Sequence, residues 1–72
     1  MAQLTVAEYD ALEAAIRDGT RIVVRHRRQD VTVVPTRLVL RNRREALESR
    51  HPTTGDTLVI WIDEAERIEI LR

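Results

Sequence analysis

The spacing of the apolar residues changes once along this 72-residue chain, at Asp18-Gly19. Before that point, apolar residues recur every three or four positions, as on one face of a helix: Val6, Tyr9, Leu12 and Ile16. After it, apolar and polar residues alternate, as along half-buried strands. Because a lone helix can bury its apolar face only against other elements, the pattern predicts a helix packed on a sheet, an α+β fold that is mainly β.

The first segment carries the sequence signals of a helix start and a helix end. Thr5 is placed to cap the N-terminus, and Glu8, three residues on, completes a capping box. Leu4 and Tyr9 flank this box at the two positions of a hydrophobic staple. A glycine suited to a left-handed backbone follows the last apolar residue of the pattern. These signals predict a helix over about 6–18.

Five short alternating segments follow the helix and are separated by tight turns. The strands are, in order, "RIVVRHR", "VTVV" continuing to Leu40, "EALESR", "TLVIWI" and "RIEIL". The turns are "RRQD", "RNRR", "HPTTGD" and "DEAE". Pro35 cannot donate a ladder hydrogen bond, so it predicts a bend or bulge in the second strand, as a curling sheet requires.

One helix and five strands in this order predict a single domain over residues 1–72. The N-terminal helix is followed, over about 20–71, by a five-stranded small antiparallel barrel of SH3 or Sm type. A helix packed on an open antiparallel sheet is the alternative arrangement of the same elements.

The composition limits what can stabilise so small a domain. A chain of this length buries only about 60% of the surface of its unfolded form. It has no cysteine, so neither a disulfide nor a thiolate zinc site adds stability, and self-association becomes a hypothesis. The absence of cysteine also fits a reducing cytoplasm. The N-terminus does not resemble a secretory signal, and the longest apolar run, "LVIWI", is too short to cross a membrane, so we expect no membrane partner.

The histidines and the loop "HPTTGD" do not form the pattern of a metal or phosphate site. His26 and His51 are the only histidines, and they lack the close helical pairing of metal ligands. The loop has one glycine and no lysine, and a strand rather than a helix follows it. We therefore expect a hairpin loop, no metal and no other cofactor.

Acidic and hydroxyl side chains occur, but not in a catalytic pattern. Asp63, Glu64 and Glu66 lie in a short turn of a chain too small for a deep cleft, so we expect them to be solvated. The hydroxyl groups without an evident base in the sequence are those of Ser49, Thr53 and Thr54. The sequence therefore predicts no catalytic residue and no enzymatic activity.

The net charge is zero, but the charge is divided unevenly along the chain. Residues 21–50 hold nine arginines and have a balance of +6, whereas residues 1–20 and 51–72 each have a balance of −3. Six of these arginines surround the first two predicted turns: Arg25, Arg27, Arg28, Arg41, Arg43 and Arg44. Two basic turns on one rim would suit the phosphate backbone of RNA or DNA, or another anion.

A protein-binding or self-assembling unit is the competing hypothesis. Tyr9 and Trp61 are the only aromatic residues, whereas single-strand binders stack bases on aromatic side chains. The arginines can also pair with the acids of the same chain. Trp61 alternates with Ile60 and Ile62, which directs it away from the inner face, either beneath the helix or outward as an anchor for a protein partner. The oppositely charged segments would suit head-to-tail contact between copies.

From Val34 onward the chain resembles the WYL domain, an Sm-like barrel of bacterial transcriptional regulators and defence systems. Three stretches carry the resemblance: "VPTRLVLRNRREAL", "TGD" and "IDEAERIEIL". The matching positions are Pro35, Leu38, Arg41, Asn42, Leu47, Asp63 and Ile68. The resemblance covers about residues 34–71 and implies a small barrel with a regulatory role.

The chain departs from the WYL pattern at two places. The triplet that names the family falls on Glu45-Ala46-Leu47, and the family's ligand-contacting arginine falls near Trp61, where this chain has none. A helix followed by such a barrel also looks like bacterial Sm-like RNA chaperones and Rho-binding antiterminators. These resemblances imply a binding module whose partner is RNA or a protein.

Overall fold

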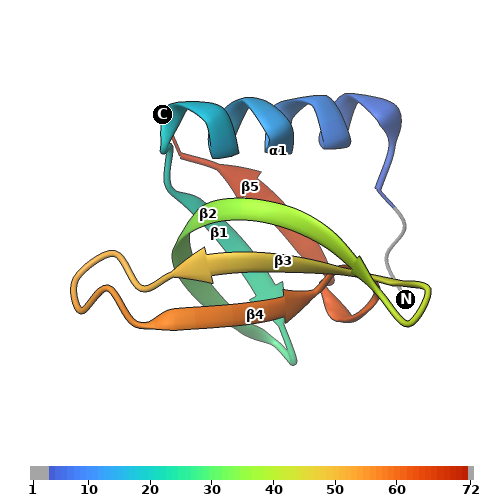
Figure 1. The fold of residues 1–72 in the computed structure, drawn as a ribbon. Coiled ribbons are helices and arrows are strands. Elements are labelled where there is room, and N and C mark those ends of the chain that lie inside the picture. Colours follow the sequence, from blue (N-terminus) through green and yellow to red (C-terminus); the bar gives the residue numbers. More distant parts are fainter. Residues whose placement is uncertain (1–3, 72) are drawn as a thin grey trace.

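The computed structural model describes residues 4–71 and shows one helix over a strongly curled sheet (Figure 1). The elements are α1 (Val6–Asp18), β1 (Ile22–His26), β2 (Gln29–Arg41), β3 (Arg44–Arg50), β4 (Thr57–Trp61), the 3₁₀ helix η1 (Ile62–Glu64) and β5 (Arg67–Ile70). The predicted α+β class, the helix and the five strands are confirmed. Within the described residues, no helix is both long and apolar enough to cross a membrane.

α1 begins and ends where its capping residues predict. The Thr5 side chain accepts a hydrogen bond from the Glu8 amide at 3.1 Å, and the Glu8 carboxylate accepts one from the Thr5 amide at 2.9 Å. Gly19 ends the helix in a left-handed conformation with φ of 70°. Leu12 is buried, but Val6 is 77% exposed. The expected apolar stripe is therefore shorter than the sequence pattern.

The sheet has the strand order β4-β3-β2-β1-β5, and all neighbours are antiparallel. Two-residue turns join β1 to β2 and β2 to β3. Their central residues all have positive φ: Arg27, Arg28, Asn42 and Arg43. Positive φ at both central positions is the requirement of a type I′ turn, which matches the twist of the strands it joins. The first turn is shorter than the predicted "RRQD", since Gln29 already pairs with His26.

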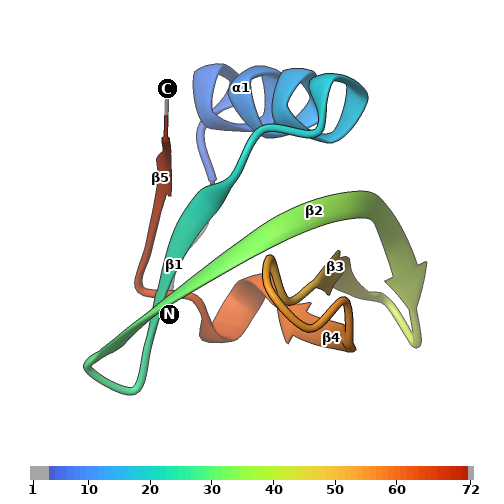
Figure 2. The same cartoon turned by 90° about the vertical axis from the view of Figure 1, so that its left-hand side faces the viewer.

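β2 bends at the predicted proline. The register between β2 and β3 shifts between Pro35 and Arg37, and the Thr36 hydroxyl donates to the Glu48 carbonyl at 2.9 Å beside this bulge. Figure 2 shows the result, with β2 arching over β3 and β4. β2 thereby pairs with β1 along its first part and with β3 along the rest.

The predicted closure of the sheet into a barrel is not observed. β4 and β5 are the two ends of the strand order, and no pairing joins them in the part of the chain that is described. After η1 the chain turns to β1, where the Glu66 amide donates to the Arg25 carbonyl at 2.7 Å, and β5 then pairs with β1. β4 instead follows β3 around the bend. The sheet is curled but open, which is the arrangement given above as the alternative.

The core lies between α1 and the concave side of the sheet. The buried apolar residues are Leu12, Ala15, Ile22, Val24, Val33, Leu47, Ile62 and Ala65. On β1 the alternation is as predicted, since Ile22 and Val24 are fully buried and Arg25 is exposed. α1 packs mainly across β2 and β5, so the far side of β4 is left without a helix above it (Figure 1).

Candidate binding groove

The two basic turns lie at opposite ends of β2. Arg27 and Arg28 form the tip of the β1–β2 hairpin, and Arg43 lies in the tip of the β2–β3 hairpin. Figure 2 shows the two tips on opposite sides of the molecule. The structure therefore does not bring the six predicted arginines together on one rim.

Three of the six arginines have acidic partners. Arg25 lies 3.7 Å from Asp30, Arg41 is paired with Glu48, and Arg44 is paired with Asp63 and Glu64. Among residues 4–71, no acid lies within ion-pair distance of the guanidinium groups of the other three: Arg27, Arg28 and Arg43. The unpartnered arginines are thus the ones at the hairpin tips, where positive φ holds the backbone.

Glu48 is an acidic centre on the outer side of the bent strands. Its carboxylate accepts hydrogen bonds from Arg37 at 2.6 Å and from Arg41 at 2.5 Å, and its side chain is only 16% exposed. The hydrogen bond from Arg37 is the main cause that lowers the pKa of Glu48 and raises that of Arg37. Arg41 is therefore paired with Glu48, which lies directly opposite Arg37 in the β2–β3 ladder.

Arg44 connects the start of β3 to the end of β4. It donates two hydrogen bonds to Asp63, at 2.8 and 2.9 Å, and a third to Glu64 at 3.2 Å. Its guanidinium carbon also lies 4.3 Å from the centre of the Trp61 ring. The hydrogen bonds that Arg44 donates to Asp63 lower the pKa of that carboxyl group. The same bonds, and to a smaller extent the bond to Glu64, raise the pKa of Arg44. We name this set of side chains the Arg44 clamp: Arg44, Trp61, Asp63 and Glu64.

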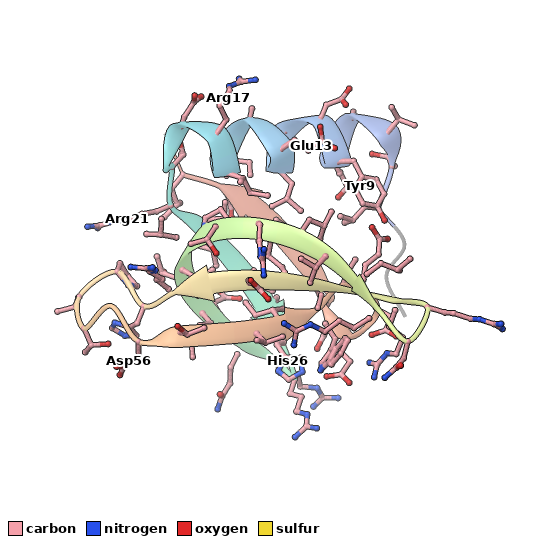
Figure 3. All side chains as sticks on the ribbon, viewed as in Figure 1. Tyr9, Glu13, Arg17, Arg21, His26 and Asp56 are labelled. Atoms are coloured by element: carbon pink, nitrogen blue, oxygen red, sulfur yellow. The ribbon has the colours of Figure 1, made fainter. Side chains whose placement is uncertain are left out.

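Trp61 lies beneath Arg44 rather than beneath α1. It is half-buried and lines an apolar groove of about 190 Å³ between the free side of β4 and the β1–β2 hairpin. The residues that line this groove are Val24, His26, Val31, Leu58, Val59, Ile60, Trp61 and Glu64. The His26 ring lies 3.2 Å from the Glu64 carboxylate at the groove, and Figure 3 shows His26 on the side of the molecule away from α1.

The strand beside this groove has no charged side chain. β4 reads "TLVIW", pairs only with β3, and has Val59 43% exposed at its centre. A strand edge presents unpaired backbone groups, and charges, prolines or bulges ordinarily prevent it from pairing with another chain. β4 has none of these, whereas β5 carries Arg67 and Glu69. The groove thus borders an edge that is competent to pair.

The remaining predicted positions have structural roles. The His51 ring accepts hydrogen bonds from the Thr53 and Thr54 amides at 3.2 Å, inside the expected hairpin loop, where Gly55 has φ of 77°. Ser49 is buried on β3, and its hydroxyl has no partner within the described residues. No group of three metal-binding side chains occurs in residues 4–71.

Sequence reasoning found Trp61 but missed most of the groove. The groove joins residues of β1, β2, β4 and η1, which lie far apart in the chain. It also missed that Tyr9, expected only as part of a staple, donates from its hydroxyl to Glu45 on β3. That hydrogen bond raises the pKa of Tyr9. The one available signal was the uncharged run "TLVIW", which stands out in a chain with 33% charged residues.

Comparisons with known proteins bear on the fold. No protein-family model matches the chain, and no curated protein matches it. Among solved structures, the chain is similar to proteasome accessory factor B/C (PafBC) of Arthrobacter aurescens, with a TM-score of 0.73 and 22% sequence identity. The similarity covers 96% of this chain but only 12% of PafBC. At this identity the similarity shows the fold alone.

Proposed function

We propose that this chain is a small non-enzymatic binding module that takes another polypeptide along the free edge of β4. The observation that carries the proposal is the uncharged edge strand beside an apolar groove, with Trp61 in its wall. An added strand would form main-chain hydrogen bonds to β4, and its alternate side chains would enter the groove. Trp61 would act as an anchor, held in place by Arg44.

The distribution of the arginines favours this proposal over nucleic-acid binding. Arginines that hold a phosphate backbone need to be gathered and free of acidic partners. Here the two tips lie at opposite ends of β2, and three of the six side chains are already paired. These surface ion pairs leave the three side chains less available to a phosphate backbone.

Selection from a random peptide library on the immobilised protein tests the proposal. We expect the selected peptides to be extended, with apolar residues at alternate positions, and to shift the emission of Trp61, the only tryptophan of the chain. Val59→Lys should weaken their binding, because it places a charge at the centre of the edge. Val6→Lys, at an exposed apolar position on α1, is the matched control and should have no effect. Failure to select any peptide, or binding that ignores Val59→Lys, would contradict the proposal.

Nucleic-acid binding through the β1–β2 tip is the second candidate. Arg27 and Arg28 are exposed and adjacent, and their guanidinium groups have no ion pair among the described residues, although the Arg28 amide donates to the Glu66 carboxylate at 3.1 Å. Fluorescence anisotropy with single-stranded RNA and with duplex DNA, repeated at several salt concentrations, tests it. Binding that weakens with salt, with a log–log slope that shrinks by about one to two when both arginines become alanine, would support this candidate. No binding at low salt would exclude it.

The finer identity of the fold is part of the same proposal. The strand order, the sharp bend in β2 and the 3₁₀ helix before β5 support an open relative of the Sm-like and SH3-like small barrels. The resemblance to WYL domains supports a regulatory role in a bacterial protein. The absence of cysteine supports the cytoplasm as its compartment.

A further inference from the structure

We propose that a second copy of this chain occupies the β4 edge, with the two β4 strands antiparallel and related by a two-fold axis through Val59. This inference rests on the proposed function, because it names the polypeptide that the edge takes. Three observations carry it: the uncharged edge, the side chains that the two-fold axis brings together, and the charges that protect β5.

A two-fold axis through Val59 brings apolar residues together at the centre of β4 and sets Thr57 opposite Trp61 at its ends. Residues directly opposite each other in an antiparallel pair lie on the same face of the sheet. Leu58 meets Ile60 of the second copy on the side that lines the groove, and both residues already pack against the core of their own chain. Val59 meets its own equivalent, so part of its exposed side chain becomes covered. The paired segment itself carries no charge, and the charged side chains next to it include Arg44 over Trp61 and Glu48 opposite Val59 on β3.

Pairing of β4 with β5 of another copy fits the observations less well. β5 has Arg67 and Glu69 at alternate positions, both exposed, so an uncharged strand beside it would lie against charged side chains. An isologous contact also closes on itself after two copies, whereas a head-to-tail contact continues to a ring or a filament. The charges on β5 therefore favour a β4–β4 dimer over a head-to-tail assembly.

The small size of the edge predicts a weak dimer. A strand of five residues provides much less than the roughly 800 Å² per partner of a typical stable interface. We expect a dissociation constant between about 1 μM and about 1 mM, so that association depends on concentration.

Sedimentation equilibrium of the full chain across that concentration range is the first test. We expect the mass to rise from one copy to two. Val59→Lys places two lysines against each other on the axis and should raise the dissociation constant on the order of a hundredfold. The position is 43% exposed, so a separate chain can solvate the lysine, and circular dichroism verifies that it folds. Val6→Lys, at a position that is 77% exposed, should leave the dimer unchanged.

A charge swap tests the two-fold axis itself. Val59→Glu alone should be as monomeric as Val59→Lys. An equimolar mixture of the two variants should recover the dimer, because lysine meets glutamate only when position 59 lies opposite itself. In a head-to-tail contact position 59 meets a different residue, and the mixture would stay monomeric.

The outcomes separate this inference from the proposed function. A wild-type dimer that both single variants lose and their mixture regains supports the second copy as occupant. A monomer at every concentration, a larger assembly, or a dimer indifferent to Val59→Lys overturns it. If the chain is monomeric while selected peptides still bind in a Val59-dependent way, the proposed function stands and the occupant is another polypeptide. If no peptide binds either, both the second-copy inference and the proposed function are wrong.

Discussion

β5, at one end of the sheet, lies beside α1 and carries Arg67 and Glu69, whereas β4, at the other end, lies beside the groove and carries no charge. Both strands end the same curled sheet, and both present unpaired backbone groups. Around β5 the fold provides a packed helix and exposed charges. Around β4 it provides the Arg44 clamp and leaves the edge open. The comparison shows that one end of the sheet is covered by a helix and flanked by charges, whereas the other end is uncharged and uncovered.

The largest effect should come from the helix-covered half. Leu12 is fully buried between α1 and the sheet, so Leu12→Ala should lower the free energy of unfolding by about 2–5 kcal/mol. Urea denaturation followed by circular dichroism measures the loss. Val6→Ala, on the exposed first turn of the same helix, should change it by no more than about 0.5 kcal/mol. Equal losses at the two positions would show that α1 does not cover the core as described.

A smaller effect should come from the Arg44 clamp in the groove half. Arg44→Lys keeps the charge but loses both the paired hydrogen bonds to Asp63 and the flat contact with Trp61. We expect lower stability than wild type, a loss smaller than that of Leu12→Ala, and a red shift of Trp61 emission as water reaches the ring. Arg43→Lys, at the neighbouring hairpin tip, is the control and should change neither quantity. An unchanged emission in Arg44→Lys would show that the clamp does not hold Trp61.

The smallest effect is a dependence on acidic pH. The carboxyl groups of Asp63 and Glu48 have pKa values lowered by arginine in the folded chain. Their contribution to stability is therefore complete above the unfolded pKa values of about 4 and is lost as the pH falls through the lower folded values. Urea midpoints between neutral pH and pH of about 3 should show this decrease. A variant with Asp63→Asn and Glu48→Gln should show a flatter profile, and an equally steep one would assign the decrease to other groups.

Local patterns predicted most of the fold. The capping box of Thr5 and Glu8, the change of period at Gly19 and the bulge at Pro35 all depend on residues close together in the chain. Barrel closure was wrong because it depends on where β4 and β5 lie relative to each other. The backbone hydrogen bond from Glu66 to Arg25 fixes β5 on β1, and no local pattern specifies that contact.

The candidate site was predicted less completely than the fold. Arginine clusters are visible in a sequence, but their partners are not, and Glu48 and Asp63 lie seven or more residues from Arg41 and Arg44. The groove is harder still to predict, since Val31 and Trp61 line it together only because the sheet curls. Alternation along "TLVIW" predicted that Trp61 points away from the inner face, but it did not indicate that Arg44 covers the ring.

Amide exchange measured by NMR tests the account most directly, because it observes β4 and β5 in the same sample. We predict that the outward amides of β4, between Thr57 and Trp61, become more protected from exchange as the protein concentration rises or a selected peptide is added. The amides of β5, between Arg67 and Ile70, should keep the same protection throughout. Protection that rises at β5 and not at β4 would contradict the account, as would protection that changes at neither strand while binding occurs.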